Sequence, residues 1–391
     1  MKSRSFTAYL LSGILLCCFL LTGCTSGAQI DQLAIVMGVG IDKGSAPDNY
    51  LVTAQIARPS HVRTANEGGA AQGKPYLDIQ QEGKGISMAM YEMMRQMSRR
   101  AYLAHNEVIV ISEDVAAETI LPILDYFIRS LEAKFTVDLV IARGTASGLL
   151  AADSNLEQMP AKHLQNLLEN QVKNASIEEM PLYKFLSDML SPGIAPTIPI
   201  MELYTDETGI QNARVQGAAV FDGGTLAGTL SAEQTRTLQL VRDKVKSGYI
   251  NLDAFGSYVS LDITHSKTSV TPRVENGRVI AKIRIRQEYI LIDTGVQADI
   301  TTEDAKAQLE RLAAMRLIQS VESLLQDTKA QGLDVCGFGQ MAYRKYPRQV
   351  EALLETWPEQ YKALEVEYDV ETVITITGSI LRPMAPKGGE Q

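Results

Sequence analysis

Hydrophobic and polar residues follow two different periods along this chain, and together they predict a mixed α+β protein. In the first half, short apolar runs typical of buried strands precede stretches whose apolar residues recur every three or four positions, as on one face of a helix. The predicted strands cover residues 29–42, 50–56, 107–112 and 135–142. The predicted helices lie around residues 86–97, 120–131, 163–168 and 182–189.

The first of these helices carries an unusual number of methionines. Apolar side chains at helical spacing would form one face, made of Ile86, Met90, Met93, Met94 and Met97. Core packing is the simpler interpretation of such a face. An adaptable groove for a partner is the alternative, because methionine fills irregular surfaces well.

In the second half, apolar and polar residues alternate one by one, which predicts antiparallel strands with one solvated face. Two hairpins are expected, one at Asp222-Gly223-Gly224 and one at Asn276-Gly277, each between alternating segments. Further strands are predicted over residues 258–264 and 364–380. The long strand pair around Asn276 is expected to extend over residues 266–288.

Two helices are predicted in this half. Ser231 and Gln234 have the spacing of a capping box, which starts a helix. A long helix is predicted over residues 302–330, with Gly332 as its end. The whole pattern predicts a multi-domain α+β ectodomain with mixed and antiparallel sheets flanked by helices.

Breaks in the pattern suggest how the chain is divided. Three prolines interrupt residues 191–199, which makes this segment the best candidate for a linker. Residues 61–74 are rich in Gly, Ala and Gln and are expected to form a mobile surface loop. We expect an N-terminal α/β domain over residues 24–200 and a C-terminal α+β domain over residues 201–385, which can subdivide into two. Residues 386–391 are expected to be a disordered tail.

The first residues have the layout of a bacterial lipoprotein signal peptide, residues 1–23. Lys2 and Arg4 precede an apolar run, which ends in Leu21-Thr22-Gly23-Cys24. Cleavage behind Gly23 would leave Cys24 as the new N-terminus, with an S-diacylglycerol thioether and an N-acyl group. Two or more acyl chains anchor a protein stably, whereas one chain binds only marginally. An uncleaved transmembrane anchor is the alternative, but the run is shorter than the roughly 20 residues that a spanning helix needs.

Composition and charge exclude several classes of protein. The formal net charge is −9, and removal of Lys2 and Arg4 with the signal would make it more negative by two. An acidic chain is a poor partner for nucleic acid or for anionic lipid. Of the four cysteines, Cys17 and Cys18 would leave with the signal and Cys24 would be acylated, so Cys336 could not form an internal disulfide. Cys336 could be a nucleophile, but a small buried residue is the simpler interpretation.

A search for catalytic, cofactor and metal motifs finds none. Gly38-Val39-Gly40 follows a strand but has neither a third glycine nor a following helix, so it is not a dinucleotide loop. The histidines at 61, 105, 163 and 265 have no metal-ligand spacing. We therefore expect a protein that is not an enzyme and that needs no cofactor.

Several further segments stand out when they are taken together. They are residues 32–43, 104–113, 125–130, 142–146, 217–221 and 337–339, then Tyr343-Arg344-Lys345-Tyr346-Pro347 and Trp357. In this order, they resemble the Ger(x)C family, the lipoprotein C subunit of bacterial spore germinant receptors. No single segment decides the resemblance, which rests on their order and spacing from Cys24 to about Pro383.

The resemblance implies a function in nutrient-triggered spore germination. Family members are lipoproteins on the outer face of the spore inner membrane. They form a complex with a multi-span A subunit and a transporter-like B subunit, and the complex responds to small nutrients. A three-domain mixed α/β arrangement is the family fold.

Two features of this chain leave alternatives open. His105 could face a partner or ligand, although a corner histidine bonded to backbone is the simpler interpretation. Residues 343–346 could contact headgroups or a partner, or could be a surface cluster with buried stems.

The opposing function is a lipid-anchored solute-binding protein that delivers a small ligand to a membrane transporter. That function predicts strand–helix alternation in both halves, which the second half lacks.

Overall fold

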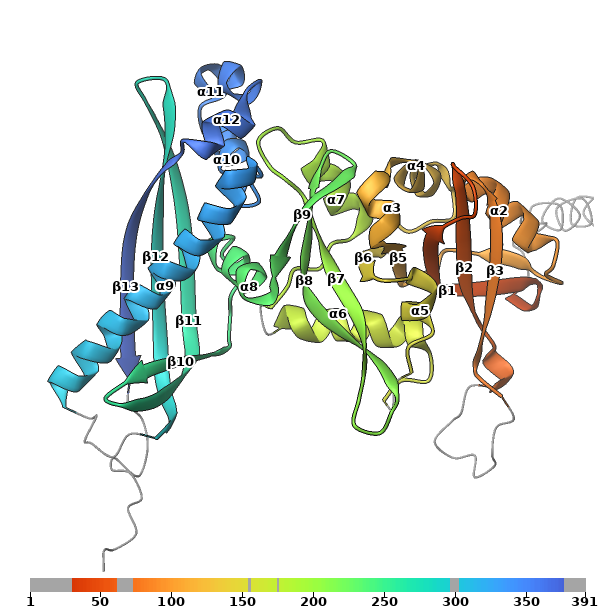
Figure 1. Ribbon diagram of the computed structural model, residues 1–391, viewed down its shortest axis with the longest axis horizontal. Coiled ribbons are helices and arrows are strands. Elements are labelled where there is room, and N and C mark those ends of the chain that lie inside the picture. Colours follow the sequence, from red (N-terminus) through yellow and green to blue (C-terminus); the bar gives the residue numbers. More distant parts are fainter. Residues whose placement is uncertain (1–29, 62–72, 154–155, 174–175, 296–301, 376–391) are drawn as a thin grey trace, which may run out of the picture.

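The structure, a computed structural model, describes residues 30–61, 73–153, 156–173, 176–295 and 302–375. Two β-sheets lie side by side along the long axis of the molecule, each flanked by helices (Figure 1). The predicted α+β class is confirmed. The signal, the loop at 62–72, the end of the last predicted strand and the C-terminal tail lie outside the described residues.

The first sheet has nine strands. Its order is β3 (Tyr76–Lys84), β2 (Asn49–Ala57), β1 (Leu33–Lys43), β5 (Val108–Ser112), β6 (Asp138–Arg143), β7 (Thr197–Thr205), β8 (Gln211–Asp222) and β9 (Thr225–Ser231), with β4 (Arg100–Tyr102) paired to β1. The central strands β1, β5, β6 and β7 are parallel, and β4 also pairs with β1 in parallel, whereas β2, β3, β8 and β9 pair antiparallel. Every residue of β5 is buried, as expected for a strand covered on both faces.

Helices cover both faces of this sheet. One face packs against α2 (Gly85–Met94), α3 (Glu113–Glu118), α4 (Leu121–Arg129) and α7 (Leu182–Met189). The other face packs against α5 (Ala146–Leu150) and α6 (Pro160–Lys173). A Cβ atom at Gly38 would lie 2.8 Å from the Ala161 Cβ, and one at Gly40 would lie 2.9 Å from Leu150. These two glycines therefore let α5 and α6 approach β1, which explains Gly38-Val39-Gly40 without a ligand.

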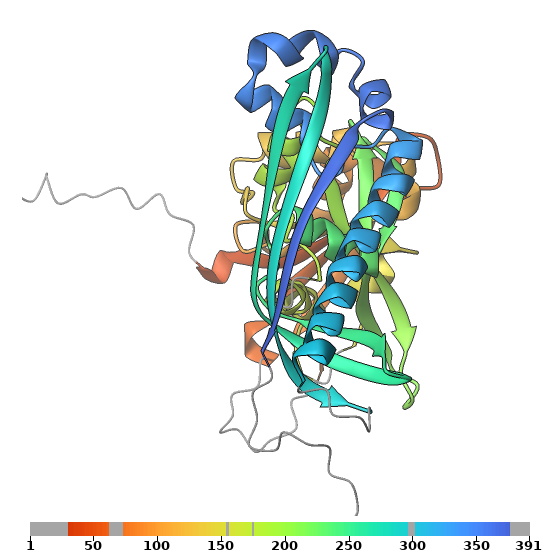
Figure 2. The same cartoon turned by 90° about the vertical axis from the view of Figure 1, so that its left-hand side faces the viewer.

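The second sheet has four strands and is mostly antiparallel. Its order is β10 (Tyr249–Ala254), β11 (Ser257–Glu275), β12 (Arg278–Thr294) and β13 (Glu365–Thr375), with only β12 and β13 parallel. The long helix α9 (Glu303–Gln331) covers one face, and the short helices α10 (Phe338–Lys345), α11 (Pro347–Leu354) and α12 (Trp357–Lys362) lie at one end (Figure 2). This half does not repeat the strand–helix alternation of the first.

Most of the expected elements are confirmed. The hairpins at Asp222 and Asn276, the capping box at Ser231 that starts α8 (Ala232–Val241), and the helix from Thr302 to Gly332 are all present. The methionine-rich helix buries Met90 and Met93 in the core, as the simpler interpretation predicts, while Met94 is exposed. The helix predicted around residues 120–131 is wrong at its end, because α4 stops at Arg129 and Leu131 is fully exposed.

Residues 191–199 do not form a free linker. The Gly193 carbonyl accepts a hydrogen bond from the Gln340 amide at 3.0 Å, and the Ala195 amide donates to the Asp334 carbonyl at 2.8 Å. Residues 197–199 already belong to β7. A Cβ atom at Gly193 would lie 2.7 Å from the Gly339 backbone, so the segment packs directly against the second half of the chain.

The expected boundary between residues 200 and 201 lies inside β7. The sheet that contains β7 continues through β8 and β9 to Ser231. The division into domains remains our proposal, and the sheet topology favours a boundary near Ser231, where α8 begins. A buried ion pair crosses this junction. The Arg242 Nη1 lies 2.6 Å from the Glu178 Oε2, and the Arg242 Nη2 donates to the Val335 carbonyl at 2.6 Å.

Candidate functional site

The lipid-carrying residue predicted from the sequence, Cys24, lies outside the described residues. The description begins at η1 (Ile30–Gln32), which leads directly into β1. Five residues lie between Cys24 and Ile30, so the chain that joins them spans at most about 20 Å. The tether would therefore join the molecule at the end that carries β1 to β4 and α2, which lies opposite the four-stranded sheet (Figure 1).

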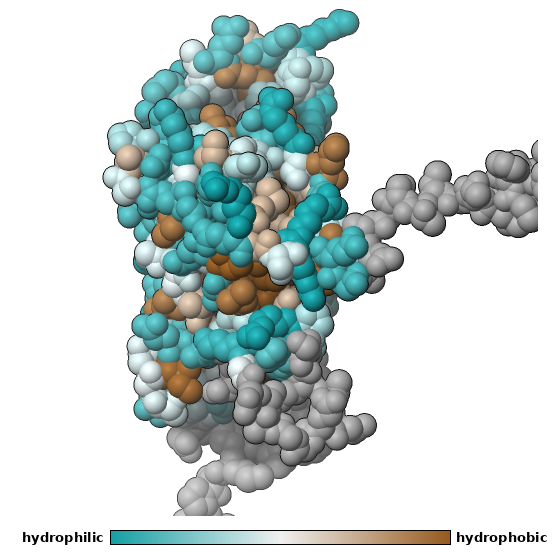
Figure 3. Space-filling view, turned by 90° about the vertical axis from the view of Figure 1, so that its right-hand side faces the viewer, coloured by the Kyte–Doolittle hydropathy of each residue, from teal (hydrophilic) through white to brown (hydrophobic). Residues whose placement is uncertain are grey.

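This end of the molecule, the predicted tethered end, exposes several large apolar side chains. Met88 and Tyr91 on α2 are 48% and 56% exposed, and Leu77 on the edge strand β3 is 49% exposed. Figure 3 views this end, where apolar side chains gather near the centre between polar ones. Apolar side chains so exposed on a soluble surface suit contact with a protein or with a membrane.

A hollow of about 380 Å³ lies at the same end. Its walls combine apolar and basic groups: Ile56, Leu77, Ile79 and Met97 line it together with Arg58 and Arg99. Arg58 is hydrogen-bonded to the His61 ring, with the Arg58 Nη2 3.1 Å from the His61 Nε2. The wall of the hollow is therefore basic, although the chain as a whole carries a negative net charge. Among the described helices, none is long and apolar enough to cross a bilayer.

His105 lies in the turn between β4 and β5 and is exposed. Its ring packs edge-on against the Tyr102 ring, with centroids 5.8 Å apart. Among the described residues, no backbone group is hydrogen-bonded to the His105 ring. The prediction that His105 is a corner histidine bonded to backbone is therefore not what the structure shows. The buried neighbour Asn106 leaves its Oδ1 without a hydrogen-bond partner.

The basic and aromatic cluster at residues 343–346 fixes the end of α10. Tyr343 and Tyr346 are partly buried against the core of the second half, whereas Arg344 and Lys345 are exposed. The Lys345 Nζ donates to the Pro272 carbonyl at 3.3 Å and lies 5.1 Å from the centre of the Tyr346 ring. The interpretation as a surface cluster with buried stems is confirmed for the two tyrosines.

The segment before α10 contains a buried carboxylate that the sequence analysis missed. The Asp334 oxygens accept hydrogen bonds from the Gly337 and Gly339 amides at 2.8 and 2.9 Å, and from the Trp357 Nε1 at 3.1 Å. Burial raises the pKa of Asp334 to about 6, even though these donors favour the charged form. The most specific block of the family resemblance, residues 337–339 and Trp357, is therefore a structural unit centred on Asp334. The sequence signal that could have indicated this carboxylate is an Asp three residues before a Gly, since Asp side chains often bond backbone amides in turns.

Cys336 lies beside this carboxylate and is buried. Burial, with the Asp334 charge nearby, raises the pKa of the Cys336 thiol far above its ordinary value. A thiol that stays protonated is a poor nucleophile, so the interpretation of Cys336 as a small core residue is confirmed. Within the described ranges, no group of three or more His, Cys, Asp or Glu side chains is arranged to hold a metal ion.

Two known protein families match this chain, one in each half. Residues 26–203 match the family described as "Spore germination protein N-terminal domain", and residues 216–378 match "Spore germination B3/ GerAC like, C-terminal". The chain belongs to the Ger(x)C family of spore germination proteins. Membership accounts for the ordered segments from residue 32 to Trp357.

Individual members of the family are similar over nearly their whole length. Spore germination protein KC of Bacillus subtilis (strain 168) is 27% identical over 385 residues, which cover 93% of this chain and 94% of that protein. Spore germination protein B3 of the same organism is 24% identical and covers 92% and 95%. The crystal structure of the GerBC protein has the same fold, with a TM-score of 0.54 at 19% identity over 88% of this chain and 99% of that one.

Proposed function

We propose that this chain is a lipid-anchored subunit of a nutrient germinant receptor and that nutrient-triggered germination requires it. The ordered match to spore germination proteins along nearly the whole chain carries the proposal. Cys24 holds the lipid, and the mature chain stands on the outer face of the spore inner membrane. There it binds a multi-span A subunit and a transporter-like B subunit.

The features of the described residues favour action through contact rather than through catalysis. The Cys336 thiol is buried beside Asp334, and the exposed His105 packs on a tyrosine. The tethered end, by contrast, exposes Met88, Tyr91 and Leu77, and it contains a hollow whose walls include Arg58 and Arg99. We propose that this end faces the membrane subunits, because a short tether keeps it close to the bilayer.

Site-specific photo-crosslinking in spores tests this orientation. A photoreactive residue at Tyr91 is expected to crosslink the full chain to an integral membrane subunit. The matched control is Tyr249, which is also an exposed tyrosine, 64% exposed, on β10 of the far sheet. Little or no crosslinking is expected from position 249. Equal yields from both positions, or crosslinks from position 249 alone, would contradict the orientation.

A further inference from the structure

A cavity of about 520 Å³ lies at the junction of the two sheets. Side chains from α8, α9, β10 and β12 line it, and Val215 and Gly217 of β8 close it from the side of the nine-stranded sheet. The volume falls in the range of sites for small organic ligands. Neither the tether nor the exposed apolar end contributes to it, so this site is independent of the proposed membrane contacts.

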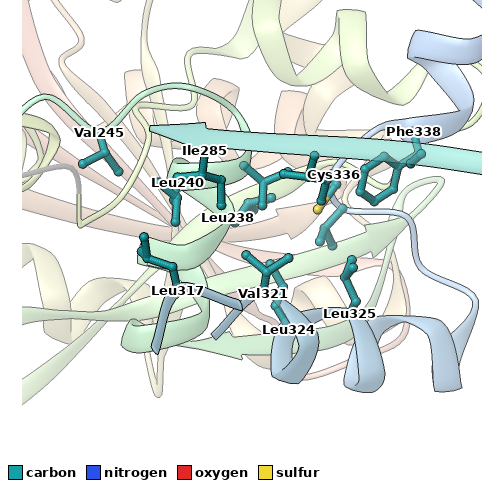
Figure 4. Close-up of a cluster of buried hydrophobic side chains, with 14 of the residues drawn as sticks. Leu238, Leu240, Val245, Ile285, Leu317, Val321, Leu324, Leu325, Cys336 and Phe338 are labelled. Carbon is teal, nitrogen blue, oxygen red and sulfur yellow. The ribbon is translucent and has the colours of Figure 1, made fainter. Parts of the chain in front are cut away.

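Much of the cavity wall is apolar and belongs to the protein core. Leu240, Val245 and Leu317 line it and are otherwise buried. In the close-up they lie on the side away from Phe338 (Figure 4). An occupant that fits here must present an apolar body to these side chains, because a fully hydrated ion would leave them facing water.

One half-buried arginine, Arg236, lines the same cavity. The Arg236 Nη2 on α8 is shielded from solvent and has no hydrogen-bond partner. Burial lowers the pKa of the Arg236 guanidinium, and the one nearby titratable group that acts on it is the phenol of Tyr289, which burial keeps neutral. Buried charges are normally paired, since desolvation without a partner is costly. The buried Nη2 of Arg236 is therefore available to a negatively charged group that enters the cavity.

The other charges of the cavity neutralise each other at its rim. The Arg316 Nη2 lies 2.6 Å from the Glu233 Oε1, and both side chains are more than half exposed. Glu233 is thus engaged with Arg316, which leaves Arg236 as the excess charge among the lining residues. The side-chain amide of Gln287, which also lines the cavity, already has hydrogen-bond partners, because it donates to the Ser266 hydroxyl and accepts from the Tyr289 hydroxyl.

We propose that this cavity binds a small organic carboxylate, with the carboxylate on Arg236 and the apolar body against Leu240, Val245 and Leu317. A guanidinium can hold a carboxylate through two parallel hydrogen bonds, which makes an arginine well suited to this ligand class. Since the walls come from both sheets, the occupant touches both halves of the molecule.

Ligand-observed NMR with hexanoate and hexanamide tests the proposal on the chain from residue 25 onward, which keeps every described element. The two probes have the same shape and differ in charge. Hexanoate is expected to bind at millimolar concentrations, and hexanamide at least about tenfold more weakly. Inorganic phosphate should not displace hexanoate. This comparison uses the natural sequence, so it does not depend on the folding of any variant.

Two variants locate the site. Arg236→Gln is expected to weaken hexanoate binding at least about tenfold and, because it removes a half-buried charge whose Nη2 has no hydrogen-bond partner, to raise the melting temperature of the ligand-free chain. Arg316→Gln, the matched control at the rim, should change binding by less than about threefold. No hexanoate binding, equal binding of hexanamide, displacement by phosphate, or unchanged binding to Arg236→Gln would each overturn the proposal.

Discussion

Buried polar side chains hold this protein together at points that the sequence pattern alone does not mark. The Asp42 carboxylate accepts hydrogen bonds from the Ala146 and Ser147 amides at 2.6 and 2.9 Å, and so caps α5 from a distant strand. Asp334 does the same for the amides of Gly337 and Gly339 at the start of α10. The sequence predicted that Cys336 is buried, but not these carboxylates, because the groups that bond Asp42 lie about a hundred residues away in the chain.

Asp138 makes the folding stability depend on pH. Burial, and then the charges of Glu179, Glu169 and Glu107, raise its pKa to about 7. The folded state therefore holds a proton that the unfolded state has lost, and this group's contribution to stability falls as pH rises from about 4 to about 7. Asp334, with a pKa of about 6, acts in the same direction.

Replacing Asp138 by Asn should remove the larger part of this loss of folding stability at high pH. Asp138→Asn is expected to stabilise the fold at pH 8 by on the order of 2 kcal/mol and to have little effect at pH 4.5. Urea unfolding at both pH values measures the difference. The exposed Asp222→Asn serves as control and should change little at either pH. Equal effects of Asp138→Asn at the two pH values would contradict the assignment.

Elements with a strong pattern of their own were predictable from sequence, whereas short or exposed ones were not. The hairpin at Asn276, the capping box at Ser231 and the helix ending at Gly332 each carry local signals that the structure confirms. The edge strand β3 is mostly half-buried and shows weak alternation, and β4 has only three residues. Such strands form because β2 and β1 offer them partners, which no local pattern reveals.

The junction between the two sheets depends on the ion pair of Glu178 and Arg242. Burial would raise the pKa of Glu178, but Arg242 and Lys184 together hold it below its ordinary value. Both side chains of the pair are nearly buried, 13% and 11% exposed. Breaking a buried pair leaves an uncompensated charge, which is more costly than losing an exposed one.

Arg242→Met is therefore expected to destabilise the fold by about 3 kcal/mol at pH 7. The penalty should shrink at pH 4, because Glu178 without its partner then takes up a proton. Arg129→Met, which removes an exposed pair with Asp125, should cost about 0–1 kcal/mol. Denaturant unfolding of both variants measures the contrast, and similar losses in the two would contradict a supporting role for Arg242.

At the scale of the whole molecule, the arrangement of the two halves could not be predicted. The prolines of residues 191–199 suggested a linker, yet this segment packs against Asp334 and Gly339 and enters β7. The cavity at Arg236 also depends on how the two halves meet, because its walls come from both sheets. Sequence patterns describe which face of an element is buried, but not which distant element covers it.

The proposed tether would give the molecule a direction. The end that carries β1 and α2, with the exposed Met88 and Tyr91, lies opposite the four-stranded sheet (Figure 1). A lipid on Cys24 would hold the first end at the membrane. The proposed receptor function requires this attachment, because an acidic chain has little attraction of its own for anionic lipid.

Replacing Cys24 by Ala in spores tests this central claim most directly. We predict that the Cys24→Ala chain is lost from the spore membrane fraction and that germination in response to nutrients is lost with it. Cys18→Ala, a matched change inside the signal, should leave both intact. Membrane retention and normal nutrient-triggered germination of Cys24→Ala spores would contradict the claim that this chain is a lipid-anchored receptor subunit.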